Sequence, residues 1–218
     1  MGGRTLSQPQ RGERFFFFYS LVLFGIVAVF FPLHALVNAD YLPPIRPLLH
    51  VHAVLTGSWF ALIVVQTGLI GRGRVALHKT LGAASLVLVA LMLPAGIWVS
   101  YENMLRTGAA QIFYGNCVNA AFFMTYYLMA LNWRQTAALH KRFMMLASLS
   151  IMFPALARVG YVFDLNPFAV LPMWLVLLFA LPAYDLIRER RIKAATLTGL
   201  GLTLVYIGIL LMIGPPPE

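Results

Sequence analysis

Long apolar stretches recur along this chain, and they constrain its fold more than any other feature. An apolar run of about 18 residues or more can cross a bilayer as a helix, which needs roughly 20 residues. Hydrophobic residues make up 61% of the chain and charged residues only 11%, whereas soluble globular domains carry about 25% charged residues. The composition excludes a soluble domain and predicts an all-α, polytopic integral membrane protein.

Seven apolar segments have the length of a membrane span, at 15–37, 48–70, 77–100, 109–132, 139–163, 167–187 and 194–214. Segment 15–37 exceeds the apolar core of a signal peptide, which has about 7–15 residues, so we interpret it as the first transmembrane helix. No connecting stretch is long enough to form a soluble domain. The sequence therefore predicts an N-terminal cytoplasmic tail at 1–14, a single seven-helix membrane domain over 15–214, and a C-terminal tail at 215–218.

The basic residues predict how this domain is oriented. Of 16 Lys and Arg residues, all but Arg46, Arg106 and Arg158 fall on one side of the seven segments. Basic loops are retained in the cytoplasm, so we expect the N-terminus inside and the C-terminus outside, in a bacterial inner membrane. The net charge of +9 then reflects contact with the lipid bilayer. The sequence contains no basic helix interleaved with exposed aromatic residues, which is the pattern that would suggest nucleic acid binding.

A short internal repeat connects two of the predicted hairpins. Ala-Leu-His-Lys occurs at 76–79 and again at 138–141, at the starts of the third and fifth segments. Both copies fall on the same side of the membrane in the predicted topology. The repeat suggests that the second and third spans and the fourth and fifth spans form two related hairpins, arranged about an axis along the membrane normal.

The two histidines of this repeat, His78 and His140, are the first candidate site. If the hairpins are related by symmetry, the imidazoles face one another and can ligate a haem iron axially. Lys79, Lys141 and Arg142 could then bind the haem propionates. The alternative is that these residues lie at the membrane interface, where long basic side chains reach lipid phosphates.

A second candidate group lies toward the outer side of the membrane. His52 shares a helix face with Thr56 and Gln66, and this polar stripe should face the bundle because lipid offers it no partner. His50 lies on another face, so His52 is expected to be the more buried. Arg158 is expected to project inward and to pair either with a carboxylate, such as Glu102 or Asp164, or with an anionic ligand.

Two further polar side chains and one metal-binding combination belong to this outer group. Asn116 and Asn119 lie on one side of the fourth segment, where they could form interhelical hydrogen bonds or line a pocket. His34 and His52, with Asp40 as a third ligand, would make a zinc or copper site of the kind that activates water. No metal-binding motif of fixed spacing supports this combination.

The two histidine motifs also carry a resemblance. Residues 77–82, Leu-His-Lys-Thr-Leu-Gly, resemble the "LHRxLG" element of a family of predicted bacterial membrane proteins of unknown function. Residues 140–144, His-Lys-Arg-Phe-Met, resemble the same family's "HRRWM" element, with Phe143 in place of tryptophan. A weaker likeness is to cytochrome b561-type membrane cytochromes, which use paired histidines on four core helices; this chain has no histidine in segment 109–132. That likeness implies bound haem.

The sequence thus predicts a small membrane redox or cofactor-binding protein. One b-type haem would be held by His78 and His140, and an outer pocket around His52 and Arg158 would admit a quinone or another small ligand. Two alternatives stay open. A non-enzymatic transporter, assembly factor or subunit of a larger membrane complex is favoured if Pro94 or Pro154 breaks a helix at mid-membrane. A metal-dependent hydrolase needs the outer metal site.

Overall fold

All regular elements of the described residues are helical. The computed structural model describes residues 11–42, 46–166 and 169–213. Along the chain they form α1 (Arg11–Val37), the short 3-10 helix η1 (Ala39–Tyr41), α2 (Pro47–Gly71), α3 (Val75–Thr107), α4 (Ala110–Asn132), α5 (Ala137–Ser150), α6 (Phe153–Val162), α7 (Val170–Glu189) and α8 (Ala194–Ile213). The predicted tails lie outside the described residues, except that α1 already begins at Arg11.

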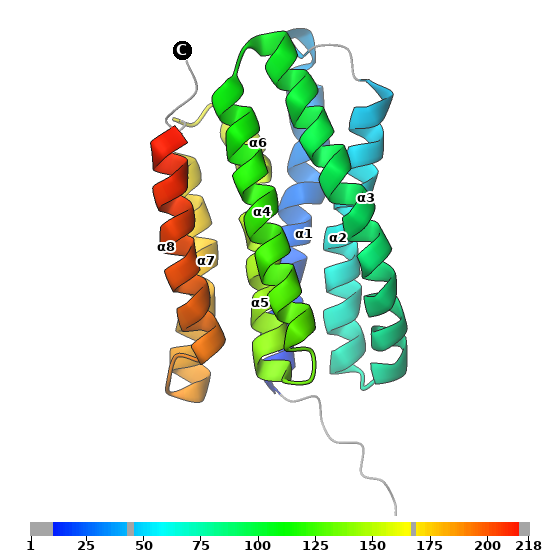
Figure 1. The fold of residues 1–218 in the computed structure, drawn as a ribbon, viewed down its shortest axis with the longest axis vertical. Helices are drawn as coiled ribbons and strands as arrows, with labels where there is room; N and C mark the ends of the chain where they lie inside the picture. Colours follow the sequence, from blue (N-terminus) through cyan, green and yellow to red (C-terminus); the bar gives the residue numbers. More distant parts are fainter. Residues whose placement is uncertain (1–10, 43–45, 167–168, 214–218) are drawn as a thin grey trace, which may run out of the picture.

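The helices run along one common direction and form an elongated bundle (Figure 1). Five of them, α1, α2, α3, α7 and α8, are long and apolar enough to cross a membrane, and α5 with α6 adds a sixth candidate if this bent pair is one span. The chain is therefore a helical, multi-pass membrane protein. The predicted segments agree with these helices to within a few residues at most ends, although α3 continues to Thr107.

Helix α4 is the seventh long element, and its composition sets it apart. It has 23 residues and no charged residue, yet it is not among the candidate spans, because Gln111, Asn116 and Asn119 lower its hydropathy. Its neighbours explain how it can be less apolar: α4 packs against α3, α5 and α8. A helix enclosed in this way can satisfy polar side chains from protein rather than lipid.

The bundle is held by large apolar side chains that meet between α1, α2, α4, α5 and α7. Its most buried members include Leu23, Trp59, Phe123, Leu149 and Trp174. The Trp59 indole ring packs edge-on against Phe123, with the ring centroids 4.8 Å apart. Both tryptophans also have a polar partner, because Trp59 Nε1 donates to Ser148 Oγ at 3.2 Å and Trp174 Nε1 donates to the Leu149 carbonyl at 3.1 Å.

The predicted fifth span is interrupted near its middle. α5 ends at Ser150, α6 begins at Phe153, and the two helices are bent by 48°. Pro154 lies at the start of α6, where a proline ring and its missing N–H disfavour a hydrogen bond back to the residue four positions earlier. Pro94 has no such effect, because α3 continues through it. The discontinuity is therefore at one of the two predicted positions.

Helices α5 and α8 pack closely at one glycine, where the Leu146 side chain of α5 fills the space beside Gly199 of α8. A Cβ atom at Gly199 would overlap a methyl group of Leu146, whereas at Gly201 it would meet nothing within 4 Å. We expect Gly199→Ala to lower the free energy of unfolding by about 1–3 kcal/mol, because overpacking strains a filled core. The measurement is thermal or denaturant unfolding in mild detergent.

Gly201→Ala is the matched control, on the same helix and with open space around it. This variant should leave the free energy of unfolding unchanged or slightly raised, because alanine has a higher helix propensity than glycine. Equal stability of the two variants would contradict the close packing of α5 against α8.

Candidate functional site

The two histidines of the repeated motif meet at one end of the bundle. His78 lies in the first turn of α3 and His140 in the first turn of α5. Their ring centroids are 6.2 Å apart and the ring planes are nearly perpendicular, at 86°. The structure therefore brings together two residues that are far apart in the sequence, as the pseudo-repeat suggested.

A hydrogen bond orients the His140 ring, whereas one nitrogen of the His78 ring has no hydrogen-bond partner. His140 Nδ1 lies 2.8 Å from the Ala130 carbonyl, which can only accept, so Nδ1 carries the proton and Nε2 keeps its lone pair. His78 Nδ1 is buried and has no hydrogen-bond partner. A histidine held by a carbonyl through one nitrogen is oriented to use the other as a ligand.

A second incomplete polar group lies beside His78. Gln66 of α2 donates from Nε2 to the backbone carbonyl of His78 at 3.2 Å, while its Oε1 is buried without a partner. Buried polar atoms without partners are rare, and those in a native structure mark a bound water, an ion or a functional role. Here two of them lie next to the histidine pair.

The neighbouring cations are only partly available to an anionic cofactor. Lys79 is exposed next to His78. Lys141 Nζ lies over the Phe16 ring, 4.5 Å from its centroid. Arg142 is 1% exposed and faces Asp185, so its guanidinium is already engaged within the protein.

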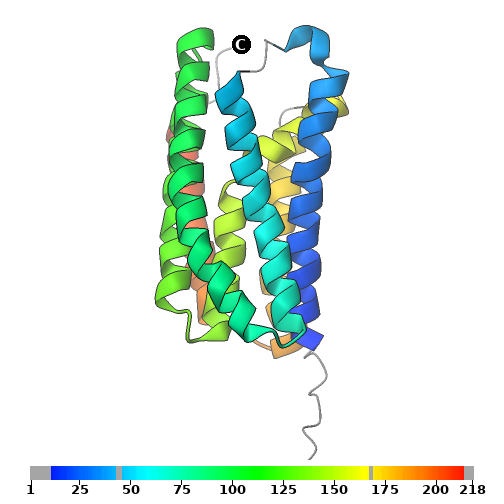
Figure 2. The same ribbon diagram turned by 90° about the vertical axis from the view of Figure 1, so that its right-hand side faces the viewer.

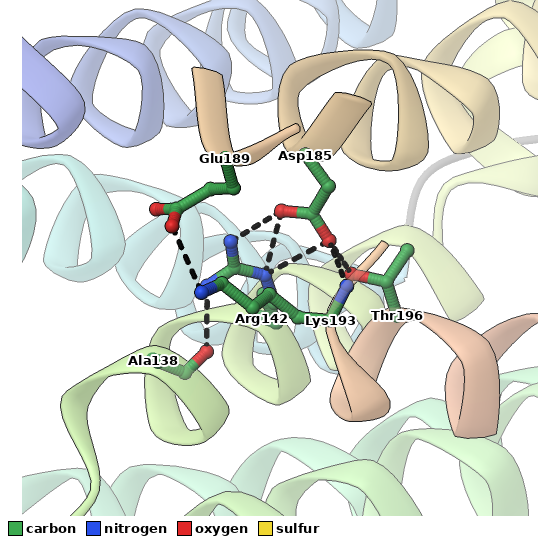
Figure 3. Close-up of polar contacts among 6 residues, drawn as sticks. All are labelled: Ala138, Arg142, Asp185, Glu189, Lys193 and Thr196. Carbon is green, nitrogen blue, oxygen red and sulfur yellow. Dashed lines mark hydrogen bonds and ion pairs between the residues drawn. The ribbon is translucent and has the colours of Figure 1, made fainter. Parts of the chain in front are cut away.

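Arg142 and Asp185 form a fully buried ion pair that joins three helices (Figure 3). Arg142 Nε donates to Asp185 Oδ1 at 3.0 Å, and its Nη2 also donates to Oδ1. Oδ2 of Asp185 accepts from the Thr196 hydroxyl at 2.5 Å and from the Lys193 backbone N–H at 3.0 Å. Arg142 Nη1 donates to the Ala138 carbonyl at 2.8 Å. α5, α7 and α8 are thereby connected through one carboxylate.

Sequence reasoning missed Asp185, although one signal pointed to it. Within the apolar segment 167–187 it is the only acidic residue, and a charge there needs a partner inside the protein. The partner lies 43 residues away, which no spacing rule reveals. Arg142 was assigned to a ligand, and the structure instead places it against this carboxylate.

Part of the outer candidate group gathers where α1 and α6 pack together. Arg158 of α6 has its guanidinium over the Phe31 ring of α1, 4.7 Å from the centroid. The His34 ring of α1 packs against Tyr161, which follows Arg158 by three residues on α6, with the ring centroids 5.2 Å apart. As expected, His52 is more buried than His50, which is exposed.

His52 sits in a space that only glycine leaves open. A Cβ atom at Gly96 of α3 would lie 2.8 Å from His52 Cε1. His52 Nδ1 also lies 3.4 Å from the Thr56 hydroxyl, one turn along α2. Packing against α3 thus fixes this ring toward the bundle.

The carboxylates suggested for Arg158 are engaged or placed elsewhere. Glu102 pairs with Arg46 at 3.4 Å and accepts from Trp98 Nε1 at 3.1 Å. Asp164 is exposed and has no described ion pair with Arg158.

For the metal site, the described residues contain no group of three or more His, Cys, Asp or Glu side chains that could hold an ion, and Asp40 is exposed in η1. The hydrolase alternative gains no support from this geometry.

Asn116 and Asn119 form hydrogen bonds between helices. Asn116 Nδ2 donates to Ser100 Oγ of α3 at 2.9 Å, and Asn119 Oδ1 accepts from the Tyr206 hydroxyl of α8 at 2.6 Å. The two amides also contact each other at 3.4 Å. They tie α4 to its neighbours, which is the interhelical alternative that the sequence left open.

No family model, curated protein or solved structure matches this chain. The resemblance of the histidine motifs therefore adds no established activity, and the argument for function rests on the two clusters themselves.

The Arg142–Asp185 pair gives a direct test of the site's framework. We expect Asp185→Asn to lower the free energy of unfolding by about 3–5 kcal/mol, because it leaves a buried guanidinium without its counter-charge. Joint replacement, Arg142→Met with Asp185→Leu, should be less damaging than Asp185→Asn, because no buried charge is left unpaired. Unfolding in detergent measures both.

Glu189→Gln is the control, since Glu189 pairs with Lys193 near the surface at 2.8 Å. A surface pair contributes little, so this variant should unfold like the wild type. If Asp185→Asn were equally well tolerated, the buried pair would not hold α5, α7 and α8 together.

Proposed function

We propose that this chain is a small membrane redox protein that holds one b-type haem between His78 and His140. The observation that carries the proposal is the histidine pair itself, with ring centroids 6.2 Å apart. At this separation both imidazoles would be able to hold the same iron ion.

The surroundings of the pair support the same interpretation. The Ala130 carbonyl orients His140 and leaves Nε2 as the coordinating atom. The unpartnered His78 Nδ1 and Gln66 Oε1 indicate that this end of the bundle accommodates a further group. Lys79, exposed on the next residue, is placed to neutralise a propionate. When bound, the haem supplies one-electron redox chemistry.

In this proposal the seven long elements, with α5 and α6 as one broken span, all cross a bacterial inner membrane. The start of α1 and the loops α2–α3, α4–α5 and α7–α8 lie at the same end of the bundle (Figures 1 and 2). These are the regions rich in Lys and Arg, which supports a cytoplasmic N-terminus and an outer C-terminus. The redox partner would be a quinone or another small ligand at the outer pocket near His52.

One observation favours a different class, a transporter or a subunit of a larger membrane complex. Helices broken within the membrane are a feature of transport proteins, and α5 and α6 are bent by 48° at such a break. In that case the histidine pair serves as a proton relay. A protein without haem would favour this second candidate.

The haem proposal is tested by visible spectra of the full-length protein, purified in mild detergent from haem-replete cells. We expect near-stoichiometric haem and a sharp α-band after reduction with dithionite. His78→Ala and His140→Ala should each abolish the band, because each removes an axial ligand. His50→Ala is the control, since His50 is exposed and lies on another helix; its spectrum should match the wild type.

A colourless wild-type protein from these cells would contradict the proposal. So would an unchanged band in His78→Ala, because a haem held by His78 cannot keep its ligation without that ring. Circular dichroism of each variant establishes that loss of colour is not loss of fold.

A further inference from the structure

Arg158 is a half-buried cation that the protein itself leaves incompletely satisfied. Its Nη1 donates to the Pro154 carbonyl of its own helix at 2.8 Å, and its guanidinium packs over Phe31. Its Nε is buried and has no hydrogen-bond partner. Five N–H groups belong to a guanidinium, so much of its donor capacity is unused.

No carboxylate neutralises this charge among the described residues. The described ion pairs are Arg46–Glu102, Arg142–Asp185 and Lys193–Glu189, and Arg158 takes part in none of them. An unpaired charge within a membrane domain is costly, so such residues pair, reach water or mark a site for a charged ligand. Arg158 therefore differs from Arg142, whose charge is fully compensated.

The groups around Arg158 are donors or neutral rings. His34 Nδ1 accepts from Asn38 Nδ2 at 3.0 Å, so its proton is on Nε2, which can donate. The His34 ring packs against Tyr161, three residues after Arg158 on α6, with centroids 5.2 Å apart. α1 and α6 thus bring one fixed cation, an imidazole and a phenol ring together, and none of the described ion pairs places an anion on this cation.

We propose that this outer cluster of Arg158 and His34 binds an anionic phosphate group. A guanidinium recognises phosphate through two parallel hydrogen bonds, and Arg158 Nε with a terminal nitrogen offers that pair. The phosphate can come from an anionic phospholipid headgroup or from a free phosphate ion. The proposal goes beyond the haem site and does not depend on it, because the residues belong to the opposite end of the bundle.

Thermal unfolding of the full-length protein tests the site with named probes. One arm compares nanodiscs of phosphatidylglycerol with nanodiscs of phosphatidylcholine, and a second adds inorganic phosphate in neutral detergent. A short-chain quinone is the uncharged probe. At a hundredfold excess over its Kd, a ligand of the folded state should raise the midpoint of a chain of this size by about 5 °C or more.

We expect phosphatidylglycerol, phosphate or both to raise the wild-type midpoint, and Arg158→Gln to abolish that gain. Arg46→Gln should retain it, because Arg46 is an exposed arginine paired with Glu102. A rise in the unfolding midpoint with phosphatidylglycerol alone identifies a lipid headgroup as the source of the phosphate group, whereas a rise with inorganic phosphate identifies a free anion.

The proposal is overturned if neither phosphate source shifts the wild-type midpoint, or if only the quinone does. It is also overturned if Arg158→Gln keeps the gain, or if Arg46→Gln loses it equally. Should Arg158→Gln fail to fold, Arg158→Lys replaces it. This variant keeps the charge but not the paired donors, so its gain should fall, and an undiminished gain would contradict the site. A failed haem test leaves all these outcomes unchanged.

Discussion

Lipid offers no hydrogen bond to a polar side chain, and the arrangement of this bundle follows from that constraint. The clearest case is the Asp185 carboxylate, which is 0% exposed and receives donors from α5 and α8 at once. The same rule explains why α4, which carries the amide side chains of Gln111, Asn116 and Asn119, packs against α3, α5 and α8. Its two asparagines find their partners on α3 and α8. Polar contacts therefore select which helices are neighbours.

Three places depart from this rule among the described residues, and two of them are where function is proposed. At one end, His78 Nδ1 and Gln66 Oε1 are buried without partners beside His140. At the other end, Arg158 has a buried Nε without a partner and no described counter-charge. The third is Gln111 Oε1 in the first turn of α4, which belongs to neither site. Buried donors such as the Trp59 and Trp174 indoles are satisfied.

The sequence was sufficient to predict the helices, because apolar segments of membrane length leave little choice of structure. It could not predict which proline breaks a helix. Pro32, Pro94 and Pro182 all lie inside continuous helices, whereas Pro154 lies at the start of α6. The difference arises from packing, since the Leu149 carbonyl next to the break accepts a hydrogen bond from Trp174 Nε1 of α7. A local rule contains no information about that partner.

In the candidate site, too, one part could be predicted from the sequence and another could not. The repeated Ala-Leu-His-Lys motif predicted that His78 and His140 could meet, because equivalent positions of two hairpins lie at the same membrane side. The role of Arg142 was not predictable, because it depends on how α5 packs against α7 and brings Asp185 beside it. The histidine pair was encoded in a local pattern, whereas the ion pair was encoded only in the tertiary packing.

The proposal on which the functional interpretation depends is that His78 and His140 would together hold one haem. Electron paramagnetic resonance of the oxidised, purified protein distinguishes a ferric haem held by two imidazoles from one held in another way. If both rings, whose centroids lie 6.2 Å apart, hold the haem, we expect a low-spin ferric signal. A high-spin signal, or no haem signal at all, would contradict the proposal.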